Sequence, residues 1–365
     1  MSGLASRIGA AILLQGLIIS IVPLARSQDR QPSATGPTAP IMERYPERLQ
    51  ARIELRQRAL STIRPPAGGF SPRSIINLTK HWRVGQTVTV AFRGGDTRLH
   101  RDIATAVTEW TQFANLTFDF GINPATGSYR SWSKSDTNFT ADIRVSFDQT
   151  GYYSHVGNDS INRDVARPGE ESLNLEGFDQ QLPDDWKAVA LHEFGHAIGF
   201  EHEHQSPIAP CDFRYNDDPG YVQTRDSFGQ FIKDPQGRRP GLYTFLGGPP
   251  NNWPRAVVDF NLNQLPDSRA YDVGPFDKDS IMKYFFPDWM FVAGTNSACY
   301  TGAENLVLSD GDKQGAAKVY PRAPEGIASA STKRTQALEA AAKIPGLPAT
   351  AQQHFQEELN KIKIK

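Results

Sequence analysis

The stretch LHEFGHAIGFEHEH, Leu191 to His204, holds four of the chain's eight histidines. It lies at the end of a predicted helix, Asp184 to Phe200, which begins directly after Pro183. His192 and His196 are four residues apart, so both side chains lie on one face of that helix, with Cβ atoms about 5 to 6 Å apart. Two imidazoles in this arrangement can bind one tetrahedral Zn²⁺.

Three further positions complete the pattern of a catalytic metal site. Glu193 stands beside His192, where a general base for a zinc-bound water is expected. Gly199 can end the helix in a left-handed conformation, so that His202 turns back as the third ligand. Three protein nitrogens leave one position open for water, which is typical of a catalytic zinc. His204 falls outside this spacing, and we interpret it as a neighbour of the ligands or a surface residue.

The full string His192-Glu193-x-x-His196-x-x-Gly199-x-x-His202 resembles the signature of the metzincin clan of zinc endopeptidases. Downstream, DSIMKY (Asp279 to Tyr284) carries a Ser-x-Met-x-Tyr pattern that is similar to the methionine-containing turn of the astacin family. The resemblance implies that Met282 forms a hydrophobic floor below the zinc. It also implies that the Tyr284 hydroxyl binds zinc at rest or hydrogen-bonds the oxyanion during the reaction.

The resemblance covers roughly residues 80–321, and it has two departures. Lys283 replaces the usual histidine before the turn tyrosine, and the segment from Pro207 to Asp279 is long. By resemblance, a precursor would silence its zinc with a cysteine or an aspartate of the pro-segment. No cysteine precedes Cys211, and Asp29, the one aspartate between Ser27 and Lys80, lies close to the expected cleavage site. We therefore expect no known zymogen switch.

Around the motif, the hydrophobic pattern predicts an α/β or α+β sheet domain. A helix is expected over Arg98 to Phe113. The predicted strands are Thr87 to Phe92, Leu116 to Phe120, Asp142 to Phe147 and Ser172 to Phe178. The resemblance narrows the fold class to α+β: a metzincin-like catalytic domain with a twisted mixed sheet, an antiparallel edge strand, an active-site helix and an irregular C-terminal subdomain containing the methionine turn. We interpret 172–178 as the edge strand that pairs with an extended substrate.

The N-terminus is typical of an exported protein. Arg7 precedes the mostly apolar run Ile8 to Leu24, and small residues end it; the alternative is an uncleaved membrane anchor. The chain divides into four predicted parts: a signal peptide (1–27), a disordered or helical N-terminal segment or pro-segment (28–79), a zinc metalloprotease catalytic domain (80–323) and a C-terminal helical extension (324–365). Residues 28–40 are expected to be disordered, 41–64 helical, and the C-terminal extension solvated.

Export changes how the two cysteines are interpreted. In an oxidising compartment Cys211 and Cys299 are expected to form a disulfide. Because neither lies near a histidine in sequence, they are not expected to bind zinc. The formal net charge of −1 and the absence of a basic block argue against a nucleic-acid partner.

We therefore predict a secreted or periplasmic zinc-dependent endopeptidase with one catalytic Zn²⁺. Its partners would be protein or peptide substrates bound in extended form, with no membrane span after signal removal, and the protein would be a monomer. The alternatives are an inactive zinc-binding adhesin or binding module, and a zinc hydrolase of a non-protein polymer. Retention of both Glu193 and Tyr284 argues against a binding module, which needs neither residue.

Overall fold

A mixed five-stranded sheet organises the N-terminal half of the described chain. The computed structural model describes residues 45–63 and 75–363, so the predicted signal peptide and the segment 28–40 lie outside it. The strands are β2 (Thr87–Phe92), β3 (Thr117–Asp119), β4 (Ile143–Ser146), β5 (Tyr152–Ser154) and β6 (Leu173–Leu175). Their order is β3-β2-β4-β6-β5, and every neighbouring pair is parallel except β5 with β6. The predicted α+β fold with an antiparallel edge strand is confirmed.

The edge strand is not the one that the sequence analysis selects. The stretch 172–178 contains β6, which pairs with β4 on one side and with β5 on the other. Its main-chain groups therefore serve two neighbours, and it cannot accept a further strand. The antiparallel edge is β5. Hydrophobic alternation identifies a strand but contains no information about its place in the sheet, which is why the prediction was wrong.

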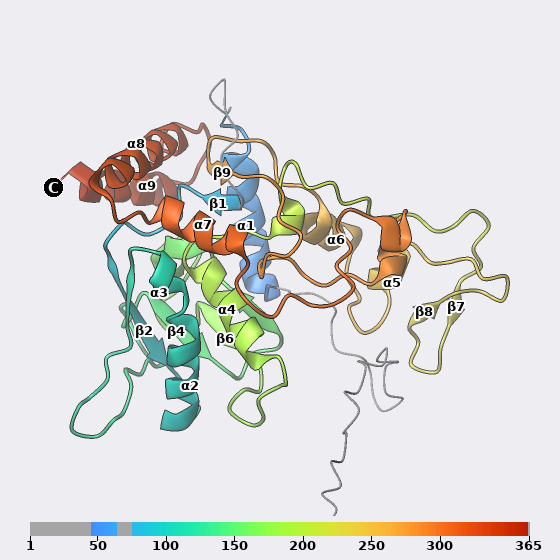
Figure 1. Cartoon of the computed structure of the whole chain (residues 1–365), viewed down its shortest axis with the longest axis horizontal. Helices are drawn as coiled ribbons and strands as arrows, with labels where there is room; N and C mark the ends of the chain where they lie inside the picture. Colours follow the sequence, from blue (N-terminus) through green and yellow to red (C-terminus); the bar gives the residue numbers. More distant parts are fainter. Residues whose placement is uncertain (1–44, 64–74, 364–365) are drawn as a thin grey trace, which may run out of the picture. The chain divides into compact units, whose positions relative to one another are not determined.

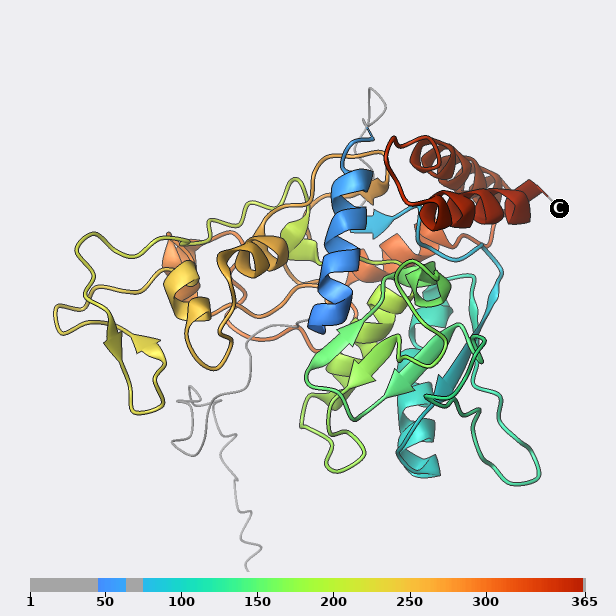
Figure 2. The same cartoon turned by 180° about the vertical axis from the view of Figure 1, so that it is seen from behind.

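Three helices cover one face of this sheet: α2 (Thr97–Val107), α3 (Trp110–Phe113) and α4 (Trp186–Ala197). In Figure 1 they lie in front of the strands, and in Figure 2 the strands face the reader. Asp96 caps α2 by accepting a hydrogen bond from the Leu99 amide. The Trp110 indole donates to the Leu191 carbonyl over 2.9 Å, so the core that α2 and α3 share with the sheet also fixes α4.

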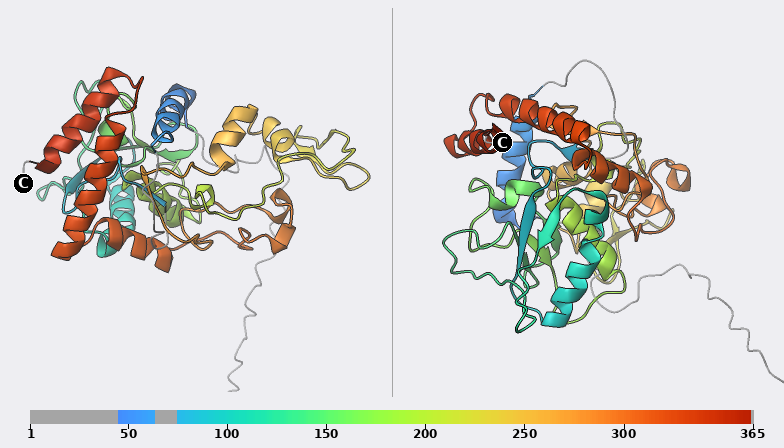
Figure 3. Two further views of the ribbon diagram at one scale, coloured as in Figure 1. Left: turned by 90° about the horizontal axis from the view of Figure 1, so that it is seen from above. Right: turned by 60° about the vertical axis from the view of Figure 1, so that its left-hand side comes forward.

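The helices at the two ends of the described chain pack together beside a small sheet. In that sheet, β1 (Ile75–Asn77) pairs antiparallel with β9 (Tyr271–Val273). The helix α1 (Glu47–Leu60) shares a buried core with α8 (Pro324–Ala341) and α9 (Ala349–Lys363), and Figure 3 shows the last two helices beside each other. Leu338 and Phe355 are fully buried there, so the prediction of a solvated extension was wrong. Its alanine-rich sequence has too little hydrophobic contrast to reveal the buried face.

Between Phe200 and α7 (Asp310–Val319) the chain forms an irregular subdomain. Its elements are the hairpin β7 (Thr224–Arg225) and β8 (Phe231–Ile232), the helices α5 (Leu242–Gly247) and α6 (Arg255–Leu262), and the short turns η2 (Glu203–Gln205), η3 (Asp288–Met290) and η4 (Gly294–Asn296). A core rich in aromatic residues holds it together and includes Cys299. The predicted Cys211–Cys299 disulfide is present, with Cα atoms 5.2 Å apart. Within the described ranges, none of the helices is long and apolar enough to cross a bilayer.

Buried charges join α1 to η1 (Gly157–Ile161), the turn that follows β5. Arg56 and Asp159 form an ion pair in which the side chains are only 5% and 4% exposed. The Lys80 ammonium lies 3.2 Å from the same carboxylate. Burial alone would raise the pKa of Asp159, but Arg56 and Lys80 lower it to about 2.

Reduction of the disulfide should lower the thermal stability without releasing the metal. The loop it closes spans 88 residues, for which chain entropy predicts a stabilisation of about 4 kcal/mol. Calorimetry and zinc analysis before and after reduction measure the two effects. Unchanged stability, or loss of zinc in the folded reduced protein, would contradict this assignment.

Replacing Asp159 with Asn should lower the free energy of unfolding by about 3 to 5 kcal/mol near neutral pH. Arg56 would lose its buried counter-charge, and Lys80 would keep only the Glu201 carboxylate, 3.7 Å away. Since the pKa of Asp159 is lower in the folded than in the unfolded state, its stabilising effect is lost as the pH falls from about 4 toward 2. Urea unfolding of wild type and Asp159→Asn, near neutral pH and in acid, should show that the difference in their stability becomes smaller in acid. Glu54→Gln, at an exposed pair, is the control. A stability difference that does not change with pH would refute the assignment.

Candidate metal centre

The helix α4 presents two imidazoles to one point. Their ring centroids are 4.8 Å apart, and the Nε2 atoms of His192 and His196 are separated by 3.1 Å. Both side chains are buried. The neighbours Leu191 and Phe194 fill the core under the sheet, so the packing that forms the helix also sets the direction of the two histidines.

The chain turns sharply after α4 and returns His202 to the same point. Gly199 has φ +105°, and a Cβ there would lie 2.9 Å from the Cβ of His81, so both its conformation and its surroundings require glycine. Its amide donates to the His196 carbonyl over 2.8 Å. After this turn the Nε2 atom of His202 lies 3.0 Å from that of His196. The structure thus brings together the three histidines predicted as ligands.

The other nitrogen of each ring is already hydrogen-bonded. The Nδ1 atom of His192 faces the Ile281 carbonyl at 2.7 Å, that of His196 the Phe200 carbonyl at 2.8 Å, and that of His202 the Gln205 side-chain oxygen at 3.2 Å. An acceptor fixes the proton on Nδ1, which leaves the Nε2 lone pair available as a ligand.

Three Nε2 lone pairs that converge in this way call for a cation. Burial also lowers the pKa of His202 to about 4, so this ring is neutral at physiological pH and suited to a metal. A set of three imidazole nitrogens matches Zn²⁺ with a remaining open position. The donor set therefore fits one zinc ion.

Glu193 lies beside the ligands and is 2% exposed. The helix α4, which carries Glu193, packs against the edge strand β5.

The methionine turn lies below and beside the histidines. Met282 is buried, and a Cβ at Gly195 of α4 would lie 2.4 Å from its sulfur, so the turn and the helix are in direct contact. The Tyr284 ring stands 4.5 Å from that of His202 and 5.2 Å from that of His192, measured between centroids. Met282 therefore contacts the helix that carries two of the histidines, and Tyr284 lies beside His192 and His202.

Asp312 holds this turn, and sequence reasoning missed it. Its carboxylate accepts the Ile281 amide over 2.9 Å and the Ser280 hydroxyl over 2.6 Å. It also forms a capping box with Ser309 at the start of α7. The Ser-x-x-Asp pattern that makes the box is visible in the sequence, but its contact with the turn is not.

Three other buried polar residues surround the centre. His204 directs Nε2 to the Asn261 carbonyl over 2.9 Å, so it is a buried neighbour of the ligands. Glu203 accepts the Asp277 amide over 2.9 Å, and burial raises its pKa to about 8. Lys283, which stands where the resemblance leads us to expect a histidine, donates to the Tyr284 carbonyl over 3.0 Å. Burial lowers the pKa of Lys283 to about 8.

Comparison with solved structures returns myroilysin, with a TM-score of 0.51 and 27% identity over 68% of this chain and 99% of that chain. A second myroilysin structure has a TM-score of 0.42 and 26% identity over 79% and 100% of the two chains. High choriolytic enzyme 1, a hatching enzyme zinc-protease from Oryzias latipes, has a TM-score of 0.36 and 16% identity over 66% and 94%. No family model and no curated protein sequence matches the chain.

The fold match to myroilysin covers almost all of that protein, and the buried triad has the spacing of the metzincin signature. The predicted resemblance to metzincin-clan, astacin-like zinc endopeptidases is therefore confirmed. The chain is a zinc metalloendopeptidase of this type.

Purified protein should contain one zinc ion per chain, and His202→Ala should weaken its binding strongly because one of three protein ligands is lost. Metal analysis after dialysis against increasing chelator measures the difference. His100→Ala, at a histidine outside the cluster, is the matched control. Equal zinc retention in wild type and His202→Ala would show that the triad is not the metal site.

Proposed function

We propose that this chain is an exported endopeptidase in which His192, His196 and His202 hold one Zn²⁺ and Glu193 is the general base for peptide-bond hydrolysis. The observation that carries the proposal is the convergence of three Nε2 atoms, with neighbours 3.0 and 3.1 Å apart, while each Nδ1 is hydrogen-bonded elsewhere. A surface histidine cluster would have no such arrangement.

Zn²⁺ bound here would act as a Lewis acid that polarises the scissile carbonyl and lowers the pKa of water toward about 7. The protein's own residues do the remaining work. Glu193 accepts the proton of the attacking water and later delivers it to the leaving amine. The Tyr284 hydroxyl donates a hydrogen bond to the substrate oxygen as negative charge develops on it.

The substrate binds in extended form along β5. In the part of the chain that the structure describes, β5 pairs with a strand on one side only. Apart from the Ser154 carbonyl, which accepts a hydrogen bond from the Tyr45 hydroxyl, main-chain groups of β5 can therefore pair with a peptide. The helix α4, which carries Glu193, packs against the same strand, which supports a scissile bond lying between β5 and the metal site. Such pairing recognises the peptide backbone and therefore favours a protein or peptide over another polymer.

Export is supported by the Cys211–Cys299 disulfide, since such bonds persist in oxidising compartments. The secreted or periplasmic location, the signal peptide over 1–27 and the monomeric state remain part of this proposal. So does the absence of a nucleic-acid partner.

Glu193→Gln should retain zinc while peptide hydrolysis falls by a factor of about 10² to 10⁴, because size is kept and the proton acceptor is removed. Tyr284→Phe should also retain zinc and lose less, mainly in kcat. Casein cleavage and metal content are measured for both, beside wild type.

Wild-type casein cleavage by zinc-loaded Glu193→Gln would refute the assigned base. Zinc-dependent activity that leaves casein uncut would favour a non-protein polymer as substrate. A folded, zinc-loaded wild-type protein with no hydrolytic activity would favour a binding module.

A further inference from the structure

The helix α1 is fastened along its length to β5 and the residues around it. The Tyr45 hydroxyl donates to the Ser154 carbonyl of β5 over 2.9 Å. One turn on, Arg48 pairs with Glu171, and Arg52 donates to the Val165 carbonyl over 3.0 Å. With the Arg56–Asp159 pair described above, these contacts follow one side of α1 from its start almost to its end.

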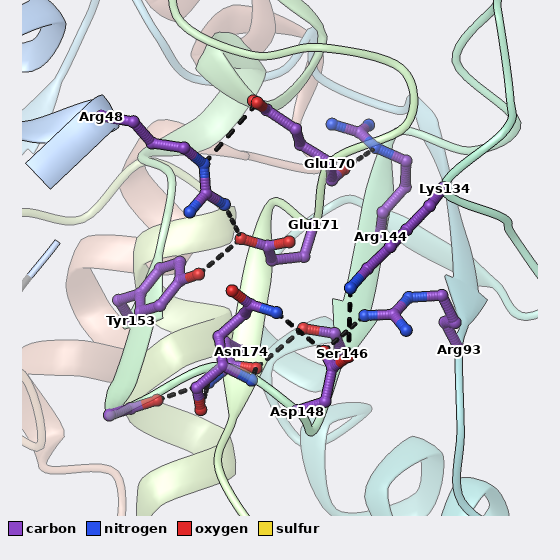
Figure 4. Close-up of polar contacts among 12 residues, drawn as sticks. Arg48, Arg93, Lys134, Arg144, Ser146, Asp148, Tyr153, Glu170, Glu171 and Asn174 are labelled. Carbon is purple, nitrogen blue, oxygen red and sulfur yellow. Dashed lines mark hydrogen bonds and ion pairs between the residues drawn. The ribbon is translucent and has the colours of Figure 1, made fainter. Parts of the chain in front are cut away.

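The contact of Arg48 reaches the edge strand through one carboxylate. Figure 4 shows Arg48 and Tyr153 directed at the same oxygen of Glu171. The Tyr153 hydroxyl donates to it over 2.6 Å, and burial and Glu171 raise the pKa of this tyrosine, so it stays protonated. Glu171 is 2% exposed, and Arg48 forms its ion pair. The cation of α1 thus fixes the carboxylate that holds the centre of β5.

Apolar packing makes α1 an integral part of the core. Leu49 is buried against Tyr45 and Tyr153. At the other end, Leu60 is buried in the core that includes α8 and α9, and the Arg56 guanidinium lies 4.9 Å from the ring centre of Phe355. Removal of α1 would expose these faces and leave Glu171 and Asp159 buried without these cations.

We propose that α1 is retained in the active protein and that Arg48 is a positioning residue for substrate binding, acting through Glu171 and Tyr153 on β5. The proposal rests on the proposed function, in which β5 pairs with the substrate. It selects between the alternatives left open for residues 28–79, because the part from Tyr45 onward then belongs to the catalytic unit. It also adds a specific route by which the N-terminal helix affects peptide binding.

Arg48→Met tests the route, with Arg58→Met as the matched control. Arg58 is on the same helix, its side chain is 77% exposed, and it pairs with Glu54 of the same helix. For a peptide long enough to lie along β5, Arg48→Met should raise KM about tenfold with kcat changed less than about twofold, as expected for loss of a charged hydrogen bond that acts on binding. Arg58→Met should change neither constant. Arg48→Lys should restore part of the lost affinity because it keeps the charge.

Two further measurements separate this proposal from the proposed function. In Arg48→Met the amides of 152–155 should exchange hydrogen faster than in wild type and in Arg58→Met, whether or not any substrate is cleaved. N-terminal sequencing of the protein that cleaves casein should find a start before Tyr45.

Unchanged KM and unchanged exchange in folded Arg48→Met would overturn the positioning role while leaving the proposed endopeptidase intact. An active protein that begins after residue 63 would overturn retention of α1. If wild type binds zinc and cleaves no peptide, the proposed function fails, and the role of Arg48 in substrate binding fails with it.

Discussion

The convergence of three imidazole Nε2 atoms on one point is the constraint on which the rest of the structure depends. With neighbours 3.0 and 3.1 Å apart, the rings need a cation between them, and each must be held by its other nitrogen. The acceptors come from the methionine turn at Ile281, from the turn after α4 at Phe200 and from Gln205. A catalytic centre of this kind therefore depends on loops far apart in sequence being fixed to one helix.

Main-chain pairing at β1 supplies much of that fixation. The Asn77 amide donates to the Gly199 carbonyl over 2.9 Å, and the Glu201 amide donates to the Ile75 carbonyl over 3.0 Å. β1 thus holds both sides of the turn that delivers His202, the third histidine of the cluster. It also pairs with β9, which leads into the methionine turn. The core that α1 shares with α8 and α9 also contains Ile75 of β1, so the first and last helices of the described chain support the strand that holds this turn.

What the sequence could predict was what local spacing determines. The period of the hydrophobic residues predicted the helix α4 and the strand β2. The spacing of the histidines predicted the triad and the glycine turn at Gly199. Spacing could not give the position of β6 in the sheet or the burial of Phe355, because both depend on contacts between distant segments. The role of Asp312 could not be predicted for the same reason. Its hydrogen bond from the Ile281 amide spans 31 residues, and no local pattern identifies a carboxylate that supports a distant turn.

X-ray absorption at the zinc edge tests the central claim most directly, because it reports the ligands of the ion itself. The wild-type protein should show three imidazole nitrogens at about 2.0 to 2.1 Å together with one oxygen ligand from water. His202→Ala that retains zinc should show two. A spectrum with sulfur ligands, or one with the same imidazole number in both proteins, would contradict the account.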